Sequence, residues 1–90
     1  MKIKSGFVLE KVGGEYLAVA VGERAKEFSG FVRLNSTGAY FWNLLAEADL
    51  TKEELVAKAL SDFEGVSAEQ ISGDVENLIK ALKDGEIIEA

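Results

Sequence analysis

Apolar and polar residues alternate in two runs near the start of the chain, and a glycine pair separates the runs. The runs are residues 7–12 and 15–21, with Gly13-Gly14 between them. This pattern predicts a β-hairpin, because a tight turn of this kind needs positive φ at both central positions. The hairpin places Val8 opposite Val19 and leaves both faces of the sheet substantially apolar. A sheet with one face in water usually alternates more cleanly, so we expect a partner to cover the second face.

The pattern changes after the hairpin. Residues 22–29 are mainly polar and charged and predict a loop or irregular turn, and residues 30–34 predict a short third strand. Residues 35–37 (Asn-Ser-Thr) offer three candidate N-caps in succession. The first helix should follow them, and its apolar side consists of Phe41, Trp42, Leu44 and Leu45.

Two further helices have clearer boundaries. Thr51 and Glu54 have the spacing of a capping box, and residues 67–70 (Ser-Ala-Glu-Gln) repeat it. Gly65 separates the two helices, and Gly85 stands where a glycine ends a helix. Apolar residues recur at helical spacing in both segments. The two stripes are Leu55, Val56, Ala59, Leu60 and Phe63, and Ile71, Val75, Leu78, Ile79 and Leu82.

The order of these elements defines the expected fold. A three-stranded antiparallel sheet followed by three helices is an α+β arrangement, and we expect residues 1–90 to form a single domain. The last two helices resemble a helix-turn-helix, so the fold is winged-helix-like. Residues 86–89 predict either a short strand or a tail that packs its isoleucines.

Composition excludes most catalytic chemistry. The 90 residues include no histidine and no cysteine, which removes thiolate nucleophiles, Cys/His zinc sites, iron–sulfur ligation and the commonest general base. The acidic residues at helix N-termini complement the helix dipole. We therefore expect no enzymatic activity, no metal site and no cofactor.

Charge opposes nucleic-acid binding. Residues 1–46 carry six basic and four acidic residues, a net charge of +2, and residues 47–90 carry four and twelve, a net charge of −8. The helix that would enter a DNA groove, residues 68–84, has four acidic and two basic residues, a net charge of −2. A protein that neutralises phosphates shows the opposite sign. No segment is long and apolar enough to span a membrane, and residues 1–10 lack a signal-peptide core, so we expect a cytoplasmic protein.

Peptide binding remains, and three features favour it. The third strand, residues 30–34, can offer the free backbone groups of a sheet edge to another strand. Gly73 lies inside the last helix, where glycine costs about 1 kcal/mol relative to alanine. It is either a tolerated surface glycine or a position that lets another backbone approach closely. The third feature is the second apolar face of the sheet.

The segment GFVRLNSTGAYFWNLL, residues 30–45, resembles the PqqD family. Members commonly show a glycine and an apolar strand, then Leu-Asn, a small residue and glycine, then Trp-x-x-Leu. A Gly-Glu-Tyr hairpin, a Thr-x-Glu-Glu-Leu helix, a Val-x-x-Glu-x-Ile-x-x-Asp-Val segment and a terminal Gly-x-Ile follow the same order in this chain. The resemblance covers roughly residues 7 to 89.

The resemblance implies a recognition element for ribosomally made, modified peptides, of the kind used in pyrroloquinoline quinone biosynthesis. The leader segment of a precursor peptide would lie as an added strand in a cleft between the third strand and the last helix, and would be presented to a radical SAM enzyme. The implied peptide-binding residues are Phe31, Val32, Arg33, Leu34, Gly73, Asn77, Lys80, Ala81 and Asp84.

Two other classes of function stay open from the sequence. One is a winged-helix transcriptional regulator, and the other is a structural dimerisation module. Pairing of two copies through the second apolar face of the sheet would produce a homodimer.

Overall fold

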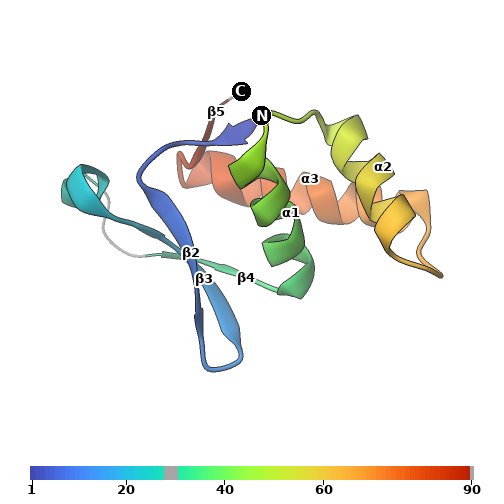
Figure 1. Cartoon of the computed structure of the whole chain (residues 1–90), viewed down its shortest axis with the longest axis horizontal. Helices are drawn as coiled ribbons and strands as arrows, with labels where there is room; N and C mark the ends of the chain where they lie inside the picture. The colour runs from blue at the N-terminus through green and yellow to red at the C-terminus, as the bar shows by residue number, and fades with distance from the viewer. Residues whose placement is uncertain (28–30, 90) are drawn as a thin grey trace.

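The computed structural model describes residues 1–27 and 31–89, and its elements follow the predicted order with one short strand and one short 3-10 helix added. The large sheet comprises β2 (Phe7–Val12), β3 (Glu15–Ala20) and β4 (Phe31–Leu34). Helices α1 (Ser36–Glu47), α2 (Lys52–Asp62) and α3 (Ala68–Asp84) follow. The predicted α+β class, a three-stranded antiparallel sheet and three helices, is confirmed (Figure 1).

The hairpin has the predicted register. Val8 pairs with Val19 and Val12 with Glu15 across β2 and β3, and β4 pairs antiparallel with the other side of β3. The turn needs positive φ only at Gly13 (φ +64°), so the expectation of positive φ at both glycines was wrong. The order β2-β3-β4 makes β4 an edge strand of the described sheet.

The segment after the hairpin differs from the predicted loop. Residues Gly22–Lys26 form a short 3-10 helix, η1, because Gly22 turns the chain at a φ of +62° as soon as β3 ends. Val21, which was expected in the strand, precedes this helix and is 40% exposed. Gly30 of the predicted third strand lies outside the described residues, as does Ala90 of the predicted domain.

The predicted caps fix where the helices begin. The Asn35 side chain accepts a hydrogen bond from the Gly38 backbone N–H at 2.7 Å, and the Ser67 hydroxyl accepts one from Gln70 at 3.1 Å. Thr51 and Glu54 form both halves of the capping box, at 3.1 Å and 3.0 Å. These bonds satisfy backbone N–H groups that have no partner within the helix.

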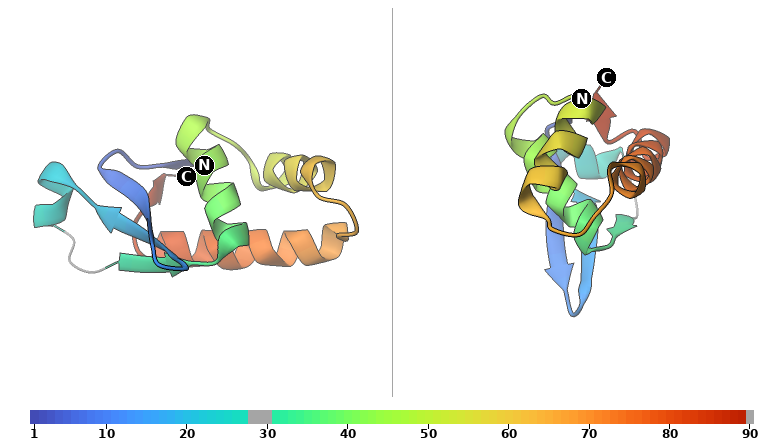
Figure 2. Two further views of the ribbon diagram at one scale, coloured as in Figure 1. Left: turned by 60° about the horizontal axis from the view of Figure 1, so that its bottom comes forward. Right: turned by 90° about the vertical axis from the view of Figure 1, so that its right-hand side faces the viewer.

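The core lies between α1, α3 and one face of the large sheet, and it continues between α3 and α2, which lies away from the sheet (Figure 2). In the left view, helix α3 runs beneath α1. Four residues of its predicted stripe are buried, namely Ile71, Val75, Leu78 and Leu82, whereas Ile79 is half-buried. Phe41 and Leu45 of α1 and Leu55 of α2 are also fully enclosed. The prediction for α2 was wrong at two positions: Leu60 and Phe63 are each 40% exposed, because α2 packs on one side only and ends at Asp62.

The end of the chain forms both of the structures that the sequence left as alternatives. Strand β5 (Ile88–Glu89) pairs with β1 (Lys2–Ile3), and Ile87 and Ile88 are buried in the core. Gly85 caps α3 with a negative φ of −85°, and Glu86 instead takes the positive φ of 57°. The space at position 85 is tight, since a Cβ there would lie 3.2 Å from Ile87 Cδ1 and 3.3 Å from Val32 Cγ2.

A hydrogen bond between a phenol and a carboxylate joins α1 to the end of α2. It makes the stability of the fold decrease at alkaline pH. The Tyr40 hydroxyl donates to Asp62 Oδ2 at 2.5 Å. Burial, followed by the hydrogen bond and the negative charge of Asp62, raises the pKa of Tyr40 from 10.0 to about 12. The folded chain thus holds this proton more tightly than the unfolded chain, so the stabilisation is complete below pH 10 and is lost as pH rises towards 12.

We therefore expect the stability difference between the unmodified chain and Tyr40→Phe to shrink between pH 10 and about pH 12. Urea unfolding of both proteins at a series of pH values measures this difference in stability. The Asp62→Asn variant should move the NMR titration of the Tyr40 ring to lower pH, because it removes the carboxylate. A stability difference that is constant over this range would contradict the assignment.

Candidate binding cleft between strand β4 and helix α3

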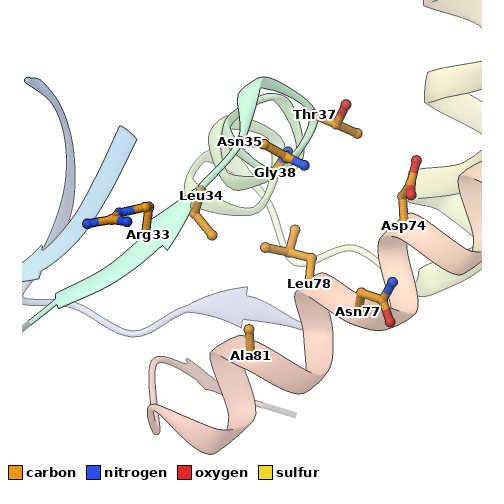
Figure 3. A pocket seen from close by; sticks show the side chains of 9 residues that line it. All are labelled: Arg33, Leu34, Asn35, Thr37, Gly38, Asp74, Asn77, Leu78 and Ala81. Carbon is orange, nitrogen blue, oxygen red and sulfur yellow. The ribbon is translucent and has the colours of Figure 1, made fainter. Parts of the chain in front are cut away.

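A cleft of about 220 Å³ separates the end of β4 and the start of α1 from helix α3 (Figure 3). It is smaller than the roughly 300–1,000 Å³ typical of pockets for small molecules. Five of its lining residues come from β4 and the first turn of α1, and four come from one side of α3. They are Arg33, Leu34, Asn35, Thr37 and Gly38, and Asp74, Asn77, Leu78 and Ala81.

The floor of the cleft is apolar and belongs to the core. Leu34 is 8% exposed and Leu78 is 7% exposed. Their side chains point toward one another between the strand and the helix (Figure 3). Because these two leucines are held by the packing of the whole domain, the floor of the cleft is rigid.

Local capping shapes the wall that α1 contributes. Asn35 ends β4 and caps α1 through the Gly38 N–H, which turns the chain sharply beside the cleft. Gly38 is buried, and an added Cβ would lie 3.3 Å from Leu34 Cβ. The small residue at position 38 therefore lets the first turn of α1 sit close against the end of β4.

The residues of the opposite wall recur at helical spacing along α3. Positions 74, 77, 78 and 81 are separated by three or four residues and so lie on one face of the helix. Ala81 is half-buried, Asn77 is exposed and Asp74 is half-buried. This wall offers an amide and a carboxylate for hydrogen bonds beside an apolar floor.

Arg33 lies at the rim of the cleft rather than within it. Its side chain points away from α3 (Figure 3), is 63% exposed, and places Nε 3.5 Å from Oε2 of Glu15 on the neighbouring strand. An exposed pair of this kind contributes little to stability, on the order of 0–1 kcal/mol.

The structure brings four of the residues predicted from the sequence to this cleft: Arg33, Leu34, Asn77 and Ala81. Lys80 and Asp84 line a separate hollow of about 610 Å³ on another side of α3, next to Lys83 and Ile79. Val32 is half-buried against the core. Phe31 pairs with Val19 on the outer face of the sheet and is 56% exposed.

Gly73 faces open space. A Cβ added there would meet no other atom within 4 Å, so the fold itself does not require glycine at this position. Asn35, Thr37, Gly38, Asp74 and Leu78 are lining residues that the sequence did not indicate as such. Helical spacing from Asn77 and Ala81 could have indicated Asp74 and Leu78.

The edge of β4 beside the cleft is open within residues 1–27 and 31–89, because β3 is the only described strand that pairs with β4. An edge strand presents unpaired N–H and C=O groups that can pair with another extended chain. The cleft thus combines a free sheet edge, an apolar floor and a polar helical wall. This combination suits an extended peptide, which can use both main-chain and side-chain contacts.

No cluster of three or more His, Cys, Asp or Glu residues suited to a metal ion occurs in the described part of the chain. Nor does any helix among the described residues combine the length and apolar character needed to cross a membrane.

Comparison with protein families gives one match over most of the chain. The profile of the family described as Coenzyme PQQ synthesis protein D (PqqD) matches residues 7–88. The chain belongs to the PqqD family. No curated protein matches the sequence at a significant level.

A solved structure shares the fold of this PqqD family member. It is described as "TbiB1 in Complex with the TbiA(beta) Leader Peptide", and the TM-score is 0.73 at 22% sequence identity. The match covers 100% of this chain and 96% of that chain. The large sheet and three helices are therefore an arrangement also found in another protein.

Replacing Gly73 by alanine should stabilise the PqqD domain by about 0.5–1 kcal/mol, because alanine loses less backbone entropy in a helix and meets no atoms here. Urea unfolding measures the change. Gly38→Ala is the matched control: it also adds a methyl group to a helix, but against Leu34, so it should gain less or lose stability. A loss in Gly73→Ala would contradict the open environment of that position.

Proposed function

We propose that this protein binds the leader segment of a ribosomally made precursor peptide as an added strand on β4, in the cleft with α3. The observation that carries the proposal is the open edge of β4 directly beside the cleft. Membership of the PqqD family supports it. The structural neighbour supports it as well, because that protein, TbiB1, is in complex with a leader peptide.

In this proposal the peptide pairs its backbone with β4 and places alternate side chains between β4 and α3. Leu34 and Leu78 would accept an apolar side chain on the floor. Asn77 and Asp74 would form hydrogen bonds with polar groups. Main-chain pairing provides affinity for any extended segment, and the side-chain contacts provide the choice among segments.

In this proposal the protein presents the precursor peptide to a modifying enzyme and is not itself the enzyme. The chain has no histidine and no cysteine, so the modification chemistry would reside in a partner. The description of the family as a coenzyme PQQ synthesis protein supports a place in pyrroloquinoline quinone biosynthesis, with a radical SAM enzyme as the partner, in the cytoplasm. Gly73, Lys80 and Asp84 would then contact either the ends of the peptide or the partner enzyme.

Charge does not favour a DNA-binding role for the same helix. Six charged residues of α3 sum to −2: Glu69, Asp74, Glu76 and Asp84 against Lys80 and Lys83. Such a surface repels phosphates. Homodimerisation through the outer face of the sheet remains a prediction that sedimentation of the protein at high concentration would test.

The binding test uses isotope-labelled protein and a synthetic leader peptide, whose sequence is taken from the small open reading frame nearest to the gene of this protein. NMR shifts should concentrate at residues 31–34 and along residues 68–84. Ala81→Arg should weaken binding at least about ten-fold, equivalent to about 1.4 kcal/mol, because it fills the cleft with a charged side chain.

The matched control is Ala46→Arg, the same substitution at an exposed position near the other end of α1. It should leave affinity within about two-fold of the unmodified protein, which corresponds to about 0.4 kcal/mol. Equal loss in both variants, or shifts that avoid β4, would show that the peptide binds elsewhere.

A further inference from the structure

The outer face of the large sheet carries a continuous apolar row that ends at the edge of β4. Val8 pairs with Val19, and Val19 pairs with Phe31, so the three side chains lie next to one another across all three strands. Val8 is 38% exposed and Phe31 is 56% exposed. Phe31 is the last member of the row and has no cross-strand neighbour on its outer side among residues 1–27 and 31–89.

A second row on the same face lies two residues away and ends in a cation. Glu10 pairs with Leu17, and Leu17 pairs with Arg33. Glu15, which pairs with Arg33 Nε, lies on β3 and so approaches Arg33 from inside the sheet. The other edge of β4 is open within the described residues. A guanidinium has five N–H donors, so Arg33 can also donate to a carboxylate from a strand added to that edge.

A peptide strand paired with β4 would extend both rows, because residues that face each other in neighbouring strands project on the same side of a sheet. We propose that this protein selects peptides with an aromatic or branched aliphatic residue beside Phe31 and an aspartate or glutamate beside Arg33, separated by one residue. The proposal rests on the strand addition proposed above. The intervening residue would project toward α3 and the cleft.

The charge of the whole protein sharpens this selection. With a formal net charge of −6, the protein repels acidic peptides in general. A carboxylate is favoured at one position of the added strand, where Arg33 stands at the edge, and neutral or basic residues are favoured elsewhere. The contacts at Phe31 and Arg33 therefore determine which residue types the peptide carries and also how the peptide strand is aligned with β4.

The order of the two residues reports the direction of the added strand. β4 runs from Phe31 to Arg33, so an antiparallel peptide presents its acidic residue first and its apolar residue two positions later. A parallel peptide presents them in the opposite order. Both described neighbours in the sheet pair antiparallel, and the antiparallel order is the expected one.

The test selects a displayed library of random peptides, each about twelve residues long, against the unmodified protein and against Arg33→Glu. With the unmodified protein, selected peptides should share an acidic residue two positions from an aromatic or branched aliphatic residue. With Arg33→Glu, lysine or arginine should replace the acidic residue at the same spacing. The Kd of an acidic peptide should rise about five-fold in Arg33→Glu, and that of its lysine counterpart should fall by a similar factor.

A second pair of variants tests the apolar contact at the edge. Phe31→Ser should weaken binding of the selected peptides about three-fold. Val8→Ser makes a comparable change at the far end of the same row and should leave the Kd unchanged.

The outcomes separate this proposal from the proposed function. Peptides that shift the NMR signals of residues 31–34 but share no such spacing, or that ignore the charge at position 33, would overturn the proposal and leave strand addition in place. If no selected peptide shifts β4 or α3, strand addition fails and the proposal fails with it.

Discussion

The burial of one side of α3 determines which residues of this helix face the cleft, and the candidate site depends on it. Val75 and Leu82 have no exposed surface, and their burial fixes the rotation of the helix about its axis. Rotation about the axis in turn decides which residues face β4. Asp74, Asn77 and Ala81 form the wall of the cleft because the adjacent side of the same helix is held in the core. At about 1.5–3 kcal/mol for each fully buried aliphatic side chain, no exposed polar contact of α3 can outweigh this constraint.

Patterns within a few residues were sufficient to predict most of the fold. The register of the hairpin follows from Gly13-Gly14, and the helix starts follow from Asn35, Thr51 and Ser67, because each of these signals acts through contacts with immediate neighbours. The pairing of β1 with β5 could not be predicted in the same way. It joins two-residue segments from the two ends of the chain, and only the finished packing brings them together. Leu60 has helical spacing, but periodicity does not show how much of a stripe the neighbouring elements cover.

The cleft was predicted in outline and missed in detail for a related reason. Removing the apolar stripe from α3 leaves every residue on the remaining sides of the helix as a candidate, and the sequence does not indicate which of these sides faces β4. Lys80 and Asp84 line a different hollow of α3, while Asn77 and Ala81 line the 220 Å³ cleft. Leu78 was assigned to the core alone, although the structure shows it in the core and on the floor of the cleft. Helical periodicity assigns each residue either to the core or to the surface, so it does not indicate a residue that contributes to both.

The double role of Leu34 and Leu78 bears on how such a domain can change during evolution. Each leucine supports the fold and also forms the surface at the base of the cleft. Truncating a buried leucine to alanine typically costs about 2–5 kcal/mol, a large part of the roughly 5–15 kcal/mol that holds a small domain folded. We therefore expect selection for stability to preserve the base of the cleft. Arg33 and Asn77 are exposed and can be exchanged at little cost to stability, so new binding preferences can arise at the rim without a change at the base.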